Sequence, residues 1–356
     1  MENSTTNFSM TIGIDLGDKH SQVCVLDAGG QIRDEIRVRT TKPGLARALA
    51  AWPGSRVVME TGTHSGWVAR GLQGAGFEVI VAHARQVHLI THSDRKNDRF
   101  DAEQLARLGR VDPKLLRPVE VRSEELARDM TVLRTRDVMV RTRTSLINEA
   151  RGLAKSLGHR LPSCSANAFA TRVRKGLEKE AWFVGLTELL DLIEAVTLRI
   201  RALEQHVDEL CRTRYPQTVA LRQVAGVGPI TALAFALTVG DAHRFTSSRT
   251  VGAYFGLRPV QRDSGQRRPE LGISKGGDRF VRWLLVQAAH YILGPFGPDS
   301  DLRRFGMRLA ARGAKAAKKK AVVAVARKLA VLLHRLWLSG EVYEPLGYRS
   351  EQMQAA

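Results

Sequence analysis

Five short apolar segments in the first third of the chain have the pattern of β-strands. Thr11 to Asp15 is an apolar run that ends on a carboxylate, and the two segments after it alternate apolar and polar residues at hairpin distance. Two later apolar runs, the first of which ends on Glu60, each follow a helical pattern. The predicted strands cover residues 11–15, 21–27, 31–39, 55–60 and 77–83.

Three other segments in this part of the chain have the pattern of short helices. Residues 44–52 and 66–76 separate the later strands, and residues 98–110 begin with acids and end with glycine and arginine, as the helix dipole favours. The order is three meandering strands and then alternating helices and strands. This is the order of the ribonuclease-H-like (RuvC-like) fold, an α/β domain with a mixed sheet, which we assign to residues 1–115.

Residues 116–215 are predicted to be helical. In the second half, apolar residues recur at alternating intervals of three and four, the spacing of a coiled-coil seam. The seam consists of Leu186, Leu189, Ile193, Val196, Ile200, Leu203, Val207 and Leu210. An earlier, arginine-rich helix repeats the spacing less regularly, and residues 160–176 are the predicted turn between the two. The pair forms an intramolecular hairpin, an oligomerisation arm with a basic side, or both.

Residues 216–356 are predicted to form a third, mainly helical domain. It opens with an apolar helix, a turn containing Gly226 and Gly228, and a second apolar helix, which is the helix-hairpin-helix pattern. The tight turn needs glycine, and amides at a helix N-terminus can bind a nucleic-acid phosphate. A plain pair of packed helices would have the same pattern, so both interpretations stay open.

The charge of the chain indicates a polyanionic partner. It has 55 Lys+Arg against 36 Asp+Glu, a formal net charge of +19 and a pI of about 10.5. Residues 301–335 favour a basic amphipathic helix on a phosphate backbone, with a solvated basic face as the alternative. Lys318, Lys319 and Lys320 are consecutive there.

Two other features of the sequence argue against a membrane partner and a disulfide framework. No apolar run reaches the ~20 residues of a membrane span, and the N-terminus lacks a signal pattern. The cysteines, Cys24, Cys164 and Cys211, are isolated, which argues against a zinc knuckle and for a reducing, cytoplasmic compartment.

Four carboxylates form the candidate catalytic site. Asp15 and Glu60 end strands that are neighbours in a ribonuclease-H-like sheet, and Asp98 and Asp101 share one face of a helix near its N-terminus. Such a group is costly unless a cation lies within it, and hard oxygen ligands suit Mg²⁺ or Mn²⁺, with two ions about 4 Å apart. Taken singly, Asp98 and Asp101 are ordinary acids at the start of a helix, and Glu60 could cap the turn after it.

Two rival sites have weaker support. The sequence GIDLG also opens actin-like ATPases and sugar kinases, but these need a second glycine-rich turn after a buried strand, and Asp263–Gly265 follows a polar segment. His88 and His92 have the spacing of a metal-binding pair, but no third ligand follows. A polar helix face explains the two histidines better.

The chain resembles the DEDD-type family of bacterial insertion-sequence transposases. GIDLGDKHS, VVMETGTHSGW and RKNDRFDAEQLARL resemble its Asp-Glu-Asp-Asp catalytic set. VAGVGPITALAFALTVGDAHRF, AYFGLRPVQRDSGQRRPELGISKGG and LVQAA resemble its C-terminal transposase domain, so the likeness covers nearly the whole chain in the right order. The segment before Asp98 reads Lys-Asn where the family more often has Lys-Thr.

The resemblance implies that Asp15, Glu60, Asp98 and Asp101 bind Mg²⁺ and that Ser264 is a nucleophile that forms a 5′-phosphoserine link to DNA. It further implies donor and target DNA as substrates, a structured bridge RNA as guide, and a dimer or tetramer in a nucleoid-associated, cytoplasmic setting. Spacing alone does not distinguish Ser264 from Ser247, Ser248 or Ser274. The expected nucleic-acid contacts are Gly226, Gly228, Arg262, Arg267, Arg268, Lys275, Lys318, Lys319 and Lys320.

Two other functions fit some of these observations. A metal-dependent nuclease or Holliday-junction resolvase of the same fold would use water as the nucleophile, and Ser264 would only shape a loop. A basic nucleic-acid-binding scaffold without chemistry would not need the four carboxylates. We therefore expect a transposase that cuts and rejoins DNA.

Overall fold

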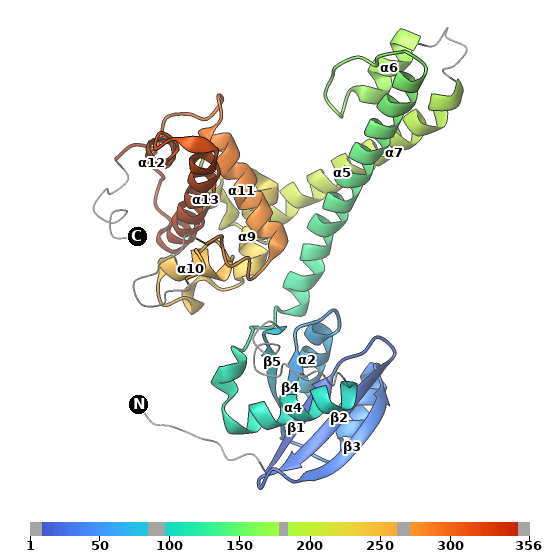
Figure 1. Cartoon of the computed structure of the whole chain (residues 1–356), viewed down its shortest axis with the longest axis vertical. Coiled ribbons are helices and arrows are strands. Elements are labelled where there is room, and N and C mark those ends of the chain that lie inside the picture. Colours follow the sequence, from blue (N-terminus) through green and yellow to red (C-terminus); the bar gives the residue numbers. More distant parts are fainter. Residues whose placement is uncertain (1–8, 85–96, 178–183, 262–270, 348–356) are drawn as a thin grey trace. The chain divides into compact units, whose positions relative to one another are not determined.

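The computed structural model describes residues 9–84, 97–177, 184–261 and 271–347 (Figure 1). The chain divides into two compact units, Met1–Glu125 and Leu126–Ala356, and each has its own hydrophobic core. The first unit is α/β and the second is helical. Within the ranges just given, none of the helices combines the length and the apolar character that crossing a membrane requires.

A mixed five-stranded sheet forms the centre of the first unit. Its strands lie in the order β3-β2-β1-β4-β5, in which β1 to β3 are antiparallel and β1, β4 and β5 are parallel. The strands are β1 (Met10–Asp15), β2 (His20–Asp27), β3 (Ile32–Arg39), β4 (Arg56–Glu60) and β5 (Glu78–Ala82). All five predicted strands are confirmed, and the order is compatible with a ribonuclease-H-like domain.

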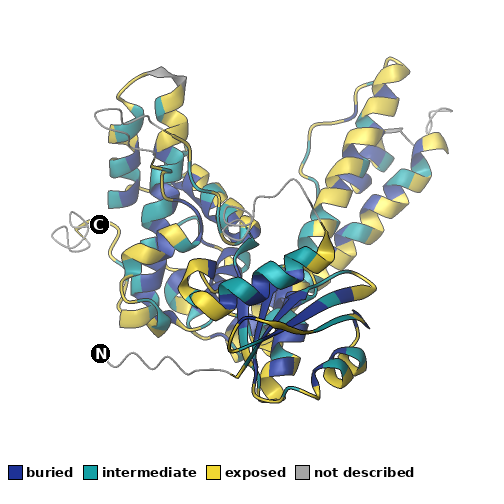
Figure 2. Ribbon diagram, turned by 60° about the horizontal axis from the view of Figure 1, so that its bottom comes forward, coloured by how far each residue is buried: buried dark blue, intermediate teal, exposed yellow. Residues whose placement is uncertain are grey.

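Helices cover both faces of this sheet, which explains why β1 is apolar almost throughout. Ile12 and Ile14 are fully buried on the face covered by α1 (Lys42–Leu49) and α2 (Ser65–Gly74). The opposite face is covered by α4 (Asp98–Val111), which packs on β1, β2 and β4. Figure 2 shows the buried residues in dark blue along the strands.

Two long helices, α5 (Glu124–Ser156) and α7 (Val184–Thr213), lie side by side and antiparallel in the second unit (Figure 1). Arg136 of α5 donates to Glu204 of α7 at 3.0 Å. Of the predicted seam residues on α7, Leu189, Val196 and Leu203 are only half-buried, and the other five are buried. The buried ones are Leu186, Ile193, Ile200, Val207 and Leu210. One side of the seam therefore packs within the chain.

The predicted turn at residues 160–176 is wrong in its second half, where α6 (Phe169–Leu177) forms. Phe169, Ala170 and Val173 share one face of α6 and are buried against Leu186 and Leu190 of α7. This burial stabilises a helix in a segment whose polar residues favour a loop.

The rest of the second unit is a helical body around one core. α9, which is apolar except for Thr231 and Thr238, is buried at its centre, and α13 packs on α8, α10, α11 and α12. The basic segment 301–335 contains two helices, α12 and α13, and Val325, Leu329 and Leu332 are buried on α13. The helices are α8 (Thr218–Leu221), α9 (Pro229–Val239), α10 (Ser248–Tyr254), α11 (Arg279–Leu293), α12 (Asp301–Ala310) and α13 (Ala314–Ser339).

Candidate active site

Two of the four candidate carboxylates emerge at one edge of the sheet. Asp15 is the last residue of β1, Glu60 is the last residue of β4, and both are half-buried. The two strands are parallel neighbours with Ile14 opposite Met59. The prediction that these strands are adjacent is therefore confirmed, and both acids lie where the strands open towards solvent.

Asp98 and Asp101 lie in the first turn of α4. The Asn97 side chain caps this helix by accepting from the amide of Arg99 at 3.1 Å. Asparagine and threonine are both favoured at the N-cap, so asparagine can replace threonine at this position. Asp98 is exposed and Asp101 is half-buried. Both carboxylates also complement the helix dipole, which alone favours acids at this position.

Arg99 ties the start of α4 to the sheet. Its guanidinium donates to the carboxylate of Glu35 on β3. This hydrogen bond and the positive charge hold the pKa of Glu35 below its ordinary value. The N-terminal turn that carries Asp98 and Asp101 is therefore attached to β3 by an ion pair.

A glycine on β1 lets α4 approach the sheet closely. A Cβ atom at Gly13 would lie 1.9 Å from the carbonyl oxygen of Ala102 and 2.6 Å from the amide nitrogen of Ala106. Ala102 directly follows Asp101, and Gly13 lies two residues before Asp15. The close contact thus fixes the start of α4 relative to the end of β1.

We predict that Gly13→Ala strongly destabilises the first unit, because the added methyl group meets backbone atoms that cannot move without shifting α4. Overpacking of this kind costs about 1–3 kcal/mol and sometimes more. Urea unfolding followed by circular dichroism measures the change. Gly71→Ala on α2 is the control, since nothing lies within 4 Å of a Cβ there, and it should be neutral or stabilise by up to about 1 kcal/mol. Equal stability of the two variants would contradict the packing argument.

The donor chemistry of the four acids fits a hard divalent cation, because carboxylate oxygens are the ligands that Mg²⁺ and Mn²⁺ prefer. The backbone brings Asp15 and Glu60 to one edge and α4 across β1. Across the residues that the structure describes, however, no three His, Cys, Asp or Glu side chains are close enough together to hold a metal ion. The structure therefore places the elements that carry the four acids side by side without gathering the carboxylates into one cluster.

The turn before α9 contains two glycines with different surroundings. Gly226 has a φ of 88°, and a Cβ there would lie 2.9 Å from Cδ1 of Tyr291 on α11. The positive φ and the close packing against Tyr291 therefore explain why glycine occupies position 226. Gly228 is the N-cap residue of α9 and has no side chain to cap the helix, and nothing lies within 4 Å of its Cβ position. A phosphate contact at this turn stays a prediction.

Exposed cations gather at the start of α13. Lys318, Lys319 and Lys320 are exposed there. Further along the helix, burial lowers the pKa of Lys328, and the neighbouring cations Arg308 and Arg327 lower it further. Like charges held near one another favour an anionic partner.

One polar pair in the second unit could not be expected from the sequence. His334 is fully buried, and its Nε2 donates to the carbonyl oxygen of Ala242 at 2.9 Å. Its Nδ1 therefore accepts from the hydroxyl of Ser248, also at 2.9 Å. Burial lowers the pKa of His334. Because the imidazole is enclosed in the core, we interpret the pair as a structural tie between α10 and α13.

Several predicted site residues lie outside the described residues. They are His88 and His92 in the segment 85–96, and Arg262, Ser264, Arg267 and Arg268 in the segment 262–270. The residues on either side of the second segment are described. Lys275 is exposed, with a φ of 55°, and its amide donates to the carbonyl oxygen of Gly256 at 3.1 Å.

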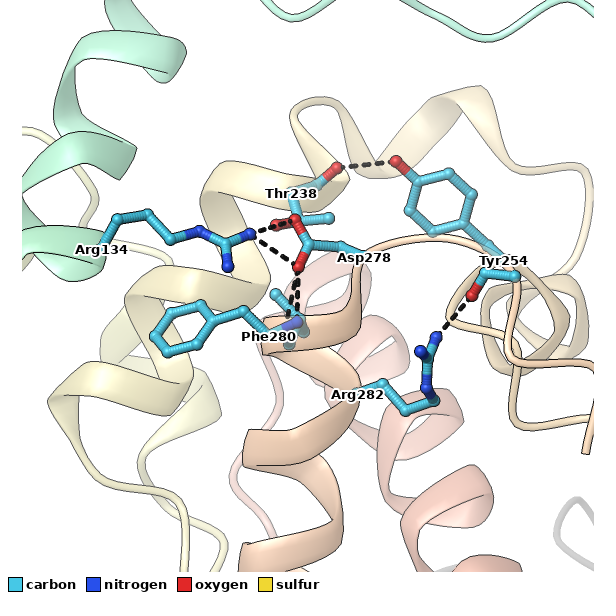
Figure 3. A network of polar contacts seen from close by, with 8 residues as sticks. Arg134, Thr238, Tyr254, Asp278, Phe280 and Arg282 are labelled. Carbon is cyan, nitrogen blue, oxygen red and sulfur yellow. Dashed lines mark hydrogen bonds and ion pairs between the residues drawn. The ribbon is translucent and has the colours of Figure 1, made fainter. Parts of the chain in front are cut away.

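The second unit also holds the start of α11 firmly (Figure 3). Asp278 accepts from the amides of Phe280 and Val281 at 2.9 and 3.2 Å, and so caps the helix. Nη2 of Arg134, from α5, donates to both oxygens of the same carboxylate at 2.9 Å. The same guanidinium lies 4.6 Å from the centre of the Phe280 ring.

The first unit is an α/β domain with a mixed sheet and with acids at the ends of two adjacent parallel strands. This arrangement is compatible with the ribonuclease-H-like class. Comparison with known proteins gives the family. The family model for DEDD transposases of the IS110 type matches residues 12–158, and the model described as the transposase IS116/IS110/IS902 family matches residues 219–301.

Curated relatives agree with these family models. The chain is 30% identical to the transposase for insertion sequence element IS1111A of Coxiella burnetii, over 93% of this chain and 90% of the relative. It is 30% identical to the transposase for IS1328 of Yersinia enterocolitica, over 78% and 82% of the two chains. It is 28% identical to a probable family 20 transposase of Pseudomonas aeruginosa, over 82% and 86%. The chain therefore belongs to the IS110/IS116/IS902 family of DEDD-type insertion-sequence transposases.

Proposed function

We propose that this transposase cuts and rejoins DNA through a covalent link to Ser264, with a divalent cation held by Asp15, Glu60, Asp98 and Asp101. Membership of the DEDD family supports DNA transposition as the activity. The observation that carries the site is that Asp15 and Glu60 end adjacent parallel strands, while α4 delivers two more acids across β1.

In the proposed reaction, the Ser264 oxygen attacks the phosphorus of a DNA phosphodiester. A bond forms between this oxygen and phosphorus, and the bond from phosphorus to the 3′ oxygen breaks. The hydroxyl loses its proton and the departing 3′ oxygen gains one, so the products are a 5′-phosphoserine and a free 3′ hydroxyl. The energy of the phosphodiester is kept in the covalent link, so a second DNA end can reverse the step without ATP.

The charged side chains have separate roles in this proposal. Arg262, Arg267 and Arg268 flank the serine in the sequence, and guanidinium groups suit the binding of a phosphate. Mg²⁺ or Mn²⁺, when bound by the four carboxylates, would supply positive charge that stabilises the charge developing on the phosphate oxygens.

A structured guide RNA is proposed as a further partner, and the protein is proposed to act as a dimer or tetramer. The net charge of +19 and the exposed Lys318 to Lys320 suit a second polyanion besides DNA. The half-buried Leu189, Val196 and Leu203 of α7 leave apolar area for contact with another copy. Sequencing of RNA that copurifies with the protein tests the first part, and light scattering tests the second.

The covalent link separates this proposal from the resolvase alternative. Incubation with end-labelled DNA and Mg²⁺ should give a protein–DNA adduct that survives a denaturing gel and is attached at a DNA 5′ end. Chelation of the metal with EDTA should remove the adduct. Cleavage with a free 5′ phosphate and no adduct would support water as the nucleophile and overturn the assignment of a serine intermediate.

A further inference from the structure

The described residues on either side of the Ser264 segment form a narrow antiparallel ribbon. We call this ribbon, together with the two residues that lead into it, the neck, and it consists of residues 254–260 and 272–277. Pro259 and Ile273 are bridge partners. The amide of Val260 donates to the carbonyl oxygen of Gly272 at 2.9 Å, and the amide of Ser274 donates to that of Arg258 at 3.0 Å. The two ends of the segment that contains Ser264 are thus held together.

The two sides of the neck approach more closely than side chains allow. A Cβ at Gly256 would lie 2.3 Å from the carbonyl oxygen of Gly276, and a Cβ at Gly277 would lie 2.0 Å from that of Tyr254. Both glycines have a φ of 67°, in the left-handed region that favours glycine. The base of the neck is therefore a crossing of two backbones at van der Waals distance, and its geometry has little freedom.

One side chain joins both backbones at this crossing. Nη1 of Arg282 donates to the carbonyl oxygen of Phe255 at 3.1 Å and to that of Gly276 at 2.6 Å. One acceptor belongs to each side of the neck. Hydrogen bonds from a charged donor are stronger than those between neutral groups, so a single guanidinium fixes the separation of the two strands.

The helix that carries Arg282 is itself held in place. Arg282 lies near the start of α11, four residues after Asp278, which caps this helix. Arg134 of α5 donates to both carboxylate oxygens of Asp278. The sequence of contacts runs from α5 through Asp278 to the start of α11, and from Arg282 to the neck. Arg282 thus connects the neck to the packed body of the second unit.

We propose that Arg282 is a positioning residue that holds the two sides of the neck, the described residues from which the chain continues to Ser264 in either direction. This inference rests on the proposed role of Ser264 as the nucleophile. Arg282 need not touch DNA, because its guanidinium is engaged with two backbone carbonyls. It acts through the neck, and its loss should slow the covalent step more than it weakens DNA binding.

Arg303 offers a matched control in the same unit. Its Nη1 also donates to two backbone carbonyls, those of Ile292 and Gly294, each at 2.6 Å, but it does so at the far end of α11. Arg282→Met and Arg303→Met therefore each remove one guanidinium that joins two carbonyls. Only the first removal affects the neck.

The test is the single-turnover rate of adduct formation at saturating DNA, at a temperature where both variants are folded. Arg282→Met should lower this rate by about tenfold to a hundredfold, since small misplacements of a reacting group cost this much. Arg303→Met should stay within about threefold of the unmodified chain. Arg282→Lys, which keeps a charged donor, should recover part of the loss. Equal rates for Arg282→Met and Arg303→Met would overturn the inference.

Amide hydrogen exchange separates this inference from the proposed function. In Arg282→Met, the amides of Val260, Ser274 and Lys275 should exchange faster, whereas in Arg303→Met they should not. If the unmodified chain forms no adduct at all, the proposed function fails, yet the exchange result still tests the neck. If adducts form and the neck amides stay protected in Arg282→Met, the positioning role fails and the proposed function stands.

Discussion

Ser264→Ala is expected to abolish both the covalent protein–DNA adduct and strand exchange. The change removes one oxygen atom, and no other group in the proposed reaction can form the phosphoserine bond. DNA binding should be retained, because phosphate contacts are spread over many cations of a chain with a net charge of +19. A denaturing gel with end-labelled DNA, together with a filter-binding assay, measures the two properties on the same samples.

Ser248→Ala is the informative control for this experiment. Ser248 is the serine of this region whose hydroxyl donates to an imidazole, that of His334, which is the arrangement of an activated nucleophile. The imidazole is fully buried between α10 and α13, so we expect Ser248→Ala to lose some stability and to keep the adduct. If the adduct persists in Ser264→Ala and disappears in Ser248→Ala, then Ser248, and not Ser264, is the nucleophile. Unchanged cleavage in Ser264→Ala without any adduct would favour the resolvase.

The sheet of the first unit is predictable because its signals are local. Each strand is an apolar run bounded by turn residues, so the predicted 11–15 and 55–60 agree with β1 and β4 to within one residue at each end. The order of strands and helices then limits the possible topologies, since parallel neighbours need a helical crossover. The placement of Asp15 and Glu60 at one edge follows from that topology alone.

The helical region is less predictable because burial there depends on distant partners. The heptad period along α7 is visible in the sequence, but which positions face α5 is set by the angle at which the two helices pack. Thr197 is buried beside α5, where Arg143 donates to its hydroxyl at 3.4 Å, whereas Val196, a predicted seam position, is half-buried. The same dependence explains α6, whose apolar face has a partner only once α7 is in place.

The polar contacts within the second unit cannot be predicted from local sequence patterns. Ser248 and His334 are 86 residues apart, and Arg134 and Asp278 are 144 residues apart. An arginine can satisfy its donors with many combinations of acceptors, so periodicity does not indicate which one it will use. The role proposed for Arg282 therefore comes from the positions of two carbonyl groups and from no motif.

Asp15→Asn is expected to stop the covalent step while nucleic-acid binding persists. The substitution keeps the size of the side chain and removes the negative charge that makes a carboxylate a stronger ligand for a divalent cation than a neutral amide. Loss of a group that stabilises a transition state typically costs about a hundredfold to a thousandfold in rate, and a lost metal ligand should cost at least that. The rate of adduct formation at saturating Mg²⁺ measures the loss, and the affinity for copurifying RNA and for DNA is measured in parallel.

Asp27→Asn provides the matched control for charge and location. Asp27 ends β2, and since β2 is antiparallel to β1, with Asp27 opposite Met10, it lies at the other edge of the same sheet. Its carboxylate pairs with Arg33 at 2.7 Å and accepts from the amide of Gln31 at 2.9 Å. A surface ion pair contributes little to stability, and the asparagine oxygen can still accept from Gln31, so the variant should stay folded. Asp27→Asn changes the net charge by the same amount as Asp15→Asn, and it should form the adduct at nearly the normal rate. If both variants lose activity equally, or if Asp15→Asn loses binding together with activity, the carboxylates at the end of β1 and β4 act through stability or through the overall field, and they do not form a catalytic metal site.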